Sequence, residues 1–257
     1  MIIRGLSQTI TLKETNTMLK KVLPAAIAAS LLAGATATTV QAGEISANVA
    51  LVSDYRFRGI SQSNEDIAIQ GGFDYAFDNG IYIGTWGSSV DFQDTLVTEF
   101  GSLELDYYAG WAMDLGENSN IDVGYIYYDY PGDDGVEGDY QEIYGKFSWR
   151  DLTVGMNYSD DYYGKTEDFY YYFADYSFAF AGDWSLDLHA GYNDLKKNGG
   201  FLATGEDSYT DYSVGLTWSV VGVDLGATYV GTTLDEKDVF ETDLAEDTVV
   251  FSVSKSF

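Results

Sequence analysis

The chain has 257 residues, 41 of them acidic, 13 basic and one histidine, and its formal net charge is −28. The absence of cysteine excludes disulfides, thiolate metal sites and a cysteine nucleophile, and a single histidine excludes a histidine-rich metal site. Aromatic residues make up 16% of the chain, which argues against disorder, because disordered acidic chains are poor in aromatics. The acidic balance also argues against nucleic acid as a partner, since phosphate binding requires a basic surface.

Residues 1–42 are expected to be an N-terminal extension and a cleaved secretory signal peptide. Residues 18–21 (MLKK) form a short basic region, residues 22–35 are mostly apolar and small, and 40–42 (VQA) match a cleavage pattern. Met18 is the expected initiator. A membrane anchor is the weaker alternative, because a span needs about 20 apolar residues. The mature domain is then 43–257, which keeps 40 acidic and 9 basic residues and a net charge of −31.

Apolar and polar residues alternate with period two along the mature domain, and this pattern predicts β-strands. In 102–115, for example, Leu, Tyr, Ala, Trp and Met fall on one face, while Glu, Asp, Tyr and Gly fall on the other. Apolar positions at helical spacing are not sustained anywhere in this region. The pattern predicts twelve strands, at 45–59, 66–77, 81–91, 99–114, 120–130, 139–149, 152–159, 168–180, 184–193, 208–219, 222–232 and 247–257.

The connections between these strands alternate in length. Short ones, such as 78–80 (DNG), which has the Asn-Gly signal of a tight turn, alternate with long ones, such as 194–207 and 233–246. This alternation is typical of outer-membrane barrels, whose turns are periplasmic and whose loops are extracellular. We therefore expect an all-β fold, a transmembrane antiparallel β-barrel of about 12 strands, in the outer membrane of a Gram-negative bacterium. Its surroundings would be outer-membrane lipid and lipopolysaccharide.

Aromatic residues and the C-terminus agree with this interpretation. Four tryptophans fall on the apolar face near short turns, where they would form an interfacial girdle: Trp111, Trp149, Trp184 and Trp218. The alternative is the ordinary enrichment of aromatic residues in sheets, which does not predict clustering at strand ends. The last strand ends in Phe257, with apolar residues at alternate positions upstream. This resembles the signal that the barrel assembly machinery recognises in bacterial outer-membrane proteins.

Three segments resemble the TorF-type porin family of proteobacteria. They are residues 53–63 (SDYRFRGISQS), 69–75 (IQGGFDY) and 84–92 (GTWGSSVDF). The likeness extends over nearly the whole mature chain, although its distinctive sequence segments lie within 53–92. It implies an outer-membrane barrel with a transport role, and it supplies no catalytic or binding residues to carry over.

Catalytic chemistry is sparse in this sequence. His189 is the single imidazole, and Asp187 lies two residues before it on the same face, but no nucleophile motif accompanies them. We therefore interpret His189 as a hydrogen-bonded interior histidine and expect no enzyme activity, no cofactor and no protein-built metal site. Loop carboxylates offer oxygen ligands for Ca²⁺ or Mg²⁺, although no loop has the spacing of an EF-hand.

The face opposite the apolar one carries ten acidic residues against three basic ones. Together with His189, they are the predicted lining of a pore: Asp54, Arg56, Arg58, Asp74, Glu104, Asp106, Asp122, Glu142, Lys146, Asp175, Asp187, Asp211 and Asp224. The leading function is a passive diffusion channel for small hydrophilic solutes, with a cation preference, because acidic rings favour cations in pores. The alternative is a non-conducting structural or surface protein whose lumen is plugged.

Overall fold

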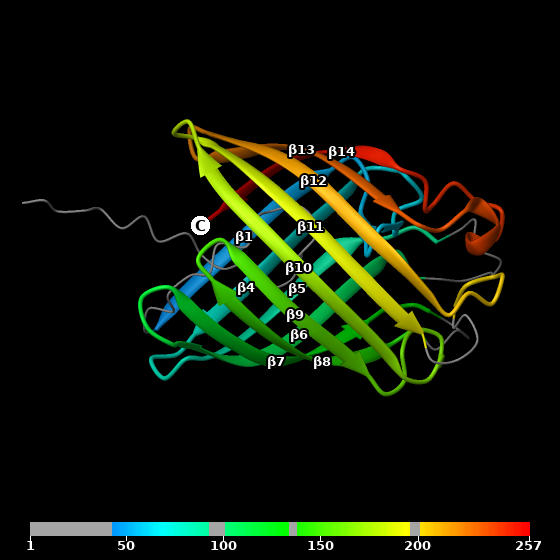
Figure 1. The fold of residues 1–257 in the computed structure, drawn as a ribbon, viewed down its shortest axis with the longest axis horizontal. Helices are drawn as coiled ribbons and strands as arrows, with labels where there is room; N and C mark the ends of the chain where they lie inside the picture. The colour runs from blue at the N-terminus through cyan, green and yellow to red at the C-terminus, as the bar shows by residue number, and fades with distance from the viewer. Residues whose placement is uncertain (1–42, 93–100, 134–137, 196–200) are drawn as a thin grey trace, which may run out of the picture.

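A computed structural model of the protein describes residues 43–92, 101–133, 138–195 and 201–257. The expected signal peptide lies outside them. The described residues form a closed antiparallel barrel of twelve strands, with one short hairpin and one 3-10 helix (Figure 1). Across these ranges we find no helix with the length and hydropathy that a bilayer span requires. The barrel strands are β1 Glu44–Val52, β4 Ala68–Ala76, β5 Ile81–Ser89, β6 Leu103–Asp114, β7 Ser119–Asp129, β8 Tyr140–Trp149, β9 Leu152–Ser159, β10 Phe169–Phe180, β11 Trp184–Leu195, β12 Ser208–Val220, β13 Val223–Thr232 and β14 Thr248–Ser256.

Each barrel strand pairs with the next one along the chain, and β14 closes the ring by pairing with β1. Closure satisfies the backbone groups of both edges, which a lipid environment demands. Glu44 pairs with Ala76, so the barrel begins at the end where the short turns lie, and Phe257 reaches the same end. Figure 1 shows this terminus opposite the helix η1, Glu236–Val239, which belongs to a long loop. The predicted alternation of short and long connections is therefore correct.

The first predicted strand is wrong in its second half. Strand β1 ends at Val52 rather than at residue 59, and the chain then turns inward. There Arg56–Phe57 (β2) and Ile60–Ser61 (β3) form a small hairpin that does not join the barrel sheet. The alternation of charged and apolar residues in 54–58 imitates a strand of the wall. The turn itself needs positive φ at Arg58 and Gly59, +48° and +85°, which ends any regular strand.

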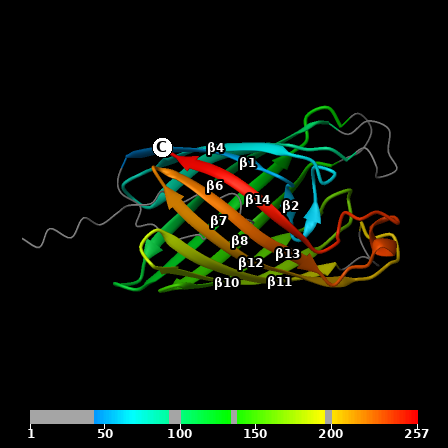
Figure 2. The same ribbon diagram turned by 90° about the horizontal axis from the view of Figure 1, so that it is seen from above.

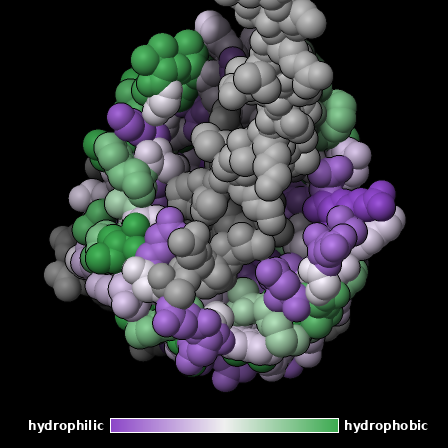
Figure 3. Space-filling view, turned by 90° about the vertical axis from the view of Figure 1, so that its left-hand side faces the viewer, coloured by the Kyte–Doolittle hydropathy of each residue, from purple (hydrophilic) through white to green (hydrophobic). Residues whose placement is uncertain are grey.

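The outer surface of the barrel is a belt of exposed apolar side chains. Ile143 is 55% exposed and Phe251 is 62% exposed, and both face away from the lumen. The predicted tryptophan positions lie on this surface beside the short turns, and Trp184 and Trp218 stack with their ring centroids 5.7 Å apart. Seen onto the short-turn end, hydrophobic and hydrophilic residues both lie around the rim (Figure 3). A belt of this kind is the surface that a bilayer covers.

Tyrosines on the inner wall lie flat across glycines of the neighbouring strand. A Cβ atom at Gly110 would stand 2.1 Å from the hydroxyl of Tyr82, and one at Gly84 would stand 2.4 Å from the ring of Tyr108. Glycine therefore leaves the space that each ring occupies. This packing fills part of the lumen with aromatic surface and directs the tyrosine hydroxyls toward interior carboxylates.

Candidate functional site

The candidate site is the lumen, which the β2–β3 hairpin enters at the long-loop end. Two views place this hairpin within the outline of the barrel (Figures 1 and 2). The hairpin and the residue before it lie close to opposite walls. Tyr55 donates a hydrogen bond of 2.8 Å to Glu104 on β6, and the backbone at Gly59 approaches β13 so closely that an added Cβ atom would stand 2.1 Å from Thr232. The inserted segment, residues 53–67, thus crosses the lumen.

Arg56 anchors the inserted segment to the loop between β13 and β14. Its side chain is 0% exposed and is paired with Asp54 and with Glu65, the latter over 3.0 Å. Nη1 of Arg56 donates to the backbone carbonyl oxygens of Leu244 and Glu246, over 2.8 and 3.1 Å. Two carboxylates and two carbonyls therefore hold this guanidinium in place.

Arg58 connects the tip of the hairpin to the opposite wall. Nη2 donates to Glu142 on β8 over 2.8 Å, and Asn157 also donates to this carboxylate, over 2.7 Å. The guanidinium carbon lies 4.3 Å from the ring centroid of Tyr171 and 4.8 Å from that of Phe169, within the range of cation–π attraction. Arg58 is therefore held by charge and by aromatic faces together, and it narrows the lumen.

An acidic excess remains at the level of the hairpin. Glu104, Asp106 and Glu142 are 2%, 3% and 0% exposed, and Arg58 is the basic partner that the structure gives to this group. Among the described residues, Oδ1 of Asp106 has no hydrogen-bond partner. Because a buried anionic oxygen without a partner is costly, these three acidic residues favour positive charge in their surroundings.

Nearer the short turns the lumen is lined by paired tyrosines and carboxylates. Tyr108 donates to Asp74 and Tyr82 donates to Asp122, each over 2.5 Å. Lys146 lies on the neighbouring strand opposite Asp122, with its ammonium 4.8 Å from the ring centroid of Tyr144. Tyr82, Tyr108 and Asp74 are buried, whereas Asp122 and Lys146 are half-buried, so this part of the wall is polar and closely packed.

His189 lies between two carboxylates on the adjacent strands. Its Nδ1 is 2.6 Å from Asp175 on β10, and its Nε2 is 2.9 Å from Asp211 on β12. The hydroxyl of Tyr171 is 2.8 Å from the same Nε2. His189 is hydrogen-bonded in the interior, as expected. Asp187 is not one of its partners, because it accepts hydrogen bonds from Ser177 and Ser185 instead. Among the described residues, the polar contacts of this imidazole are two carboxylates and a tyrosine hydroxyl.

The structure places the predicted lining residues in three groups. Asp54, Arg56 and Arg58 belong to the inserted segment and not to the first strand, which corrects their predicted position. Asp224 lies at a short turn and accepts a hydrogen bond from Ser219. The remaining ones project from the inner wall: Asp74, Glu104, Asp106, Asp122, Glu142, Lys146, Asp175, Asp187, His189 and Asp211.

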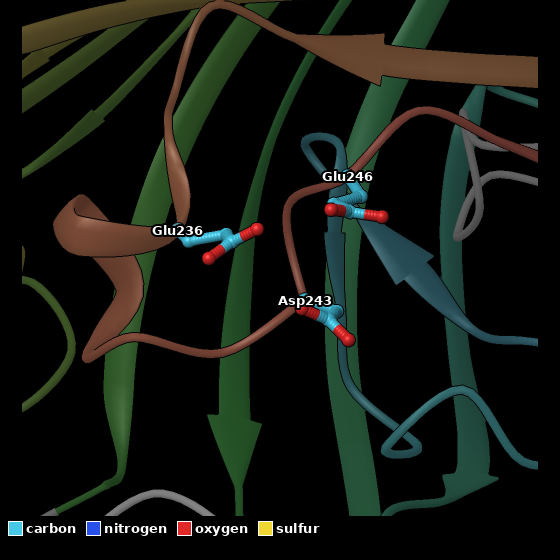
Figure 4. A group of neighbouring side chains, drawn as sticks. All are labelled: Glu236, Asp243 and Glu246. Carbon is cyan, nitrogen blue, oxygen red and sulfur yellow. The ribbon is translucent and has the colours of Figure 1, made fainter.

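One acidic cluster lies outside the lumen, in the loop between β13 and β14. Carboxylate oxygens of Glu236, Asp243 and Glu246 lie within 4.8 Å of one another, and all three side chains are exposed (Figure 4). The nearby charge of Asp243 raises the pKa of Glu246 above its ordinary value. The spacing suits an oxygen-ligated cation such as Ca²⁺, and it concentrates negative charge at this mouth of the barrel.

Comparison with known proteins identifies the family. The profile of a family described as bacterial proteins of unknown function, Gcw_chp, matches residues 36–257. The chain belongs to this family. No curated protein matches it. Its fold is similar to that of the KdgM porin, at 11% identity and a TM-score of 0.53 over 82% of this chain and 98% of that one.

Two further solved structures agree with the fold of this Gcw_chp protein. The NanC porin is 13% identical, with a TM-score of 0.53 over 83% of this chain and 99% of that one. A KdgM porin in complex with disordered oligogalacturonate gives 10% identity and a TM-score of 0.52, over 83% and 97%. The Gcw_chp chain is thus a twelve-strand barrel that resembles Gram-negative outer-membrane porins.

Sequence reasoning missed the aromatic partners within the Gcw_chp lumen. Tyr55, Tyr108 and Tyr171 donate hydrogen bonds to interior carboxylates, yet none was a predicted lining residue. The signal was present in the alternation itself, since Tyr108 shares the inner face with Glu104 and Asp106. Tyrosine occurs on both faces of a membrane barrel, and its identity alone therefore does not indicate a direction.

Proposed function

We propose that this protein is an outer-membrane channel through which small hydrophilic solutes diffuse passively, with a preference for cations. The observation that supports it is a closed twelve-strand barrel, apolar outside and acidic inside, whose lumen is narrowed by an inserted segment. Twelve strands enclose more space than eight, which side chains can fill, and less than the sixteen of wide porins. The similarity of the fold to that of KdgM and NanC porins supports a transport role.

The resemblance of residues 53–63, 69–75 and 84–92 to the TorF-type porins supports the same proposal. We propose that the chain is related to that group. The distinctive part of the first segment is the hairpin itself, which carries Arg56 and Arg58 across the lumen. On this proposal, that segment of sequence specifies the narrowest level of the channel.

A second candidate, a barrel with a plugged lumen, is favoured by the burial of the hairpin contacts. Arg56, Arg58 and Glu142 are 0%, 3% and 0% exposed, so almost none of their surface is accessible to water. Such packing is expected of a plug, and equally of the wall of an eyelet whose opening lies beside the hairpin. The two candidates therefore differ in whether the resting protein conducts.

Removal of the hairpin distinguishes them. Val52 pairs with Ala68, so a short Asn-Gly turn in place of residues 54–66 would connect β1 to β4 directly. Single-channel conductance in planar bilayers is then measured for the parent and the variant. We expect small steps from the parent and larger steps from the variant. A silent parent with a conducting variant would establish the plug, and silence of both, with intact heat-modifiable mobility, would refute a channel.

A further inference from the structure

A cavity of about 400 Å³ lies between the inserted hairpin and the long loops. Nine of its fifteen lining residues are aromatic, contributed by the hairpin, by loops and by strand ends, and one, Asp238, is charged. The size falls within the range of pockets for small organic ligands. Within the part of the chain that the structure describes, the lining contains no lysine or arginine. It is therefore an aromatic chamber with one carboxylate.

The rings of the chamber form an edge-to-face arrangement. Tyr140 meets Tyr162 and Tyr163 at centroid distances of 4.8 and 6.3 Å, with interplanar angles of 69° and 89°, and Tyr163 meets Tyr130 at 5.9 Å and 78°. The lining therefore combines rings in different orientations. Any ring face turned to the cavity offers the negative part of the aromatic quadrupole to a ligand.

Charge around the chamber favours a positive ligand. Asp238 is 4% exposed, and its carboxylate accepts hydrogen bonds from the hydroxyl of Thr204 and, over 2.8 Å, from the backbone N–H of Asp235. The cluster of Glu236, Asp243 and Glu246 belongs to the same loop (Figure 4). Because aromatic faces and carboxylates both attract cations, these two features of the chamber both favour a cationic ligand over an anionic one.

The neighbouring Arg58 shows how these aromatic residues receive a cation. Its guanidinium carbon lies 4.6 Å from the ring centroid of Phe57 and 5.7 Å from that of Tyr162, and both residues also line the chamber. Glu142 neutralises this arginine from the far side, so it does not repel a second cation strongly. We propose that the chamber binds an organic cation, an amine or quaternary ammonium carried on an aromatic or alkyl body.

The proposal does not depend on conduction, because a closed barrel would bind the same ligand. Three probes of similar size and different charge test it: 2-phenylethylamine, 2-phenylethanol and phenylacetate. Binding to the full chain in a non-ionic detergent is measured by calorimetry, with empty micelles as the blank. We expect the amine to bind about two- to fivefold more tightly than the alcohol, the effect of one cation–π contact, and phenylacetate to bind most weakly.

Two variants assign the binding to the chamber. Tyr163→Leu keeps most of the volume and removes a ring face, and Asp238→Asn removes the charge; each should weaken amine binding, the first by about two- to fivefold. Tyr172→Leu, on the outer wall where Tyr172 is 43% exposed, is the matched control and should leave it unchanged. Equal binding of all three probes, tighter binding of phenylacetate, no binding of the amine, or an equal loss in the control would each overturn the proposal.

Discussion

Nη2 of Arg58 lies 2.8 Å from both carboxylate oxygens of Glu142, although the two residues are 84 positions apart in the chain. Their side chains are 3% and 0% exposed. An ion pair so deeply buried is worth little relative to an apolar pair of the same shape, but loss of one partner leaves the other charge without compensation. The pair therefore determines where the hairpin sits more than how stable the barrel is.

This asymmetry predicts the outcome of a double-mutant cycle. Glu142→Met should lower the free energy of unfolding by about 3–5 kcal/mol, because Arg58 stays buried without its carboxylate, and Arg58→Met should be costly because Glu142 then loses its cation. The double variant Arg58→Met, Glu142→Met should lose much less than the sum. Urea unfolding in detergent, followed by heat-modifiable mobility, measures all three. As a control, Asp161→Ala breaks a pair whose side chains are 43% and 47% exposed and should cost less than about 1 kcal/mol. Additive costs in the cycle would contradict the argument.

Selectivity should follow the acidic excess beside the hairpin. Neutralising Glu104 and Asp106 together, as E104Q/D106N, removes two carboxylates while leaving the Arg58–Glu142 pair intact. If the lumen conducts, the reversal potential in a KCl gradient should indicate cation preference in the parent and less of it in the variant. The preference should weaken at 1 M salt, where the Debye length is about 3 Å. Asp183→Asn, at a short turn, is the control. A parent reversal potential on the anion side would mean that these acids are fully compensated.

His189 should carry a proton on both ring nitrogens at neutral pH. A carboxylate only accepts hydrogen bonds, and each nitrogen faces one, from Asp175 and Asp211. The competing arrangement is a neutral ring whose Nε2 accepts from Tyr171, 2.8 Å away. Nitrogen NMR of an ¹⁵N-histidine-labelled chain with a histidine-free tag gives one imidazole signal, because the sequence has one histidine. Two protonated nitrogens are expected, and an acceptor-type shift for Nε2 would favour the tyrosine arrangement.

The orientation of the barrel predicts which connections are exposed on intact cells. Gly164 lies in a long loop and Gly182 in a short turn, and both have positive φ and no atom within 4 Å of an added Cβ. An epitope inserted at Gly164 should be labelled on intact cells, and one at Gly182 only after the outer membrane is broken. Gly164 and Gly182 form a matched pair of insertion sites. Gly135 and Gly199, which the sequence also offers as insertion sites in long connections, lie outside the described residues. The reverse labelling pattern would overturn the orientation.

Removal of Phe257 should reduce outer-membrane yield. Its backbone N–H donates to the carbonyl of Ala47 over 2.9 Å, so the last residue helps to close β14 onto β1, and its side chain is 67% exposed. Phe257→Ala keeps the backbone contact and removes the ring. A loss of yield in both variants would indicate recognition of the side chain by the assembly machinery, and a loss in the deletion alone would indicate closure. Unchanged yield and heat-modifiable mobility in both would sink the prediction.

Most of the barrel was predictable because two patterns recur along the chain. Inward and outward side chains alternate within each strand, and short and long connections alternate between strands. Alternation determines the face of Glu104 and Phe251, and turn residues such as Asn79-Gly80 mark the short end. Strand β9 has the predicted bounds, 152–159. These patterns are local, and they can therefore be recognised in the sequence without knowing which distant residues are in contact.

The candidate site was less predictable, because its geometry depends on contacts between distant segments. Nothing near Arg58 in the sequence indicates Glu142, and the alternating charges of 54–58 imitate a wall strand. His189 contacts Asp175 and Asp211 across neighbouring strands rather than Asp187 along its own. Register between strands decides these partners, and periodicity within one strand does not contain the register.

The anchoring of Arg56 has a consequence for the order in which the barrel is assembled. The hairpin follows β1, the first strand, while the carbonyls of Leu244 and Glu246 that Arg56 binds precede β14, the last. These contacts can form only when both segments are in place. The hairpin therefore lacks this anchor until the segment before β14 arrives, and its position is fixed by the last part of the chain and not only by its neighbours in sequence.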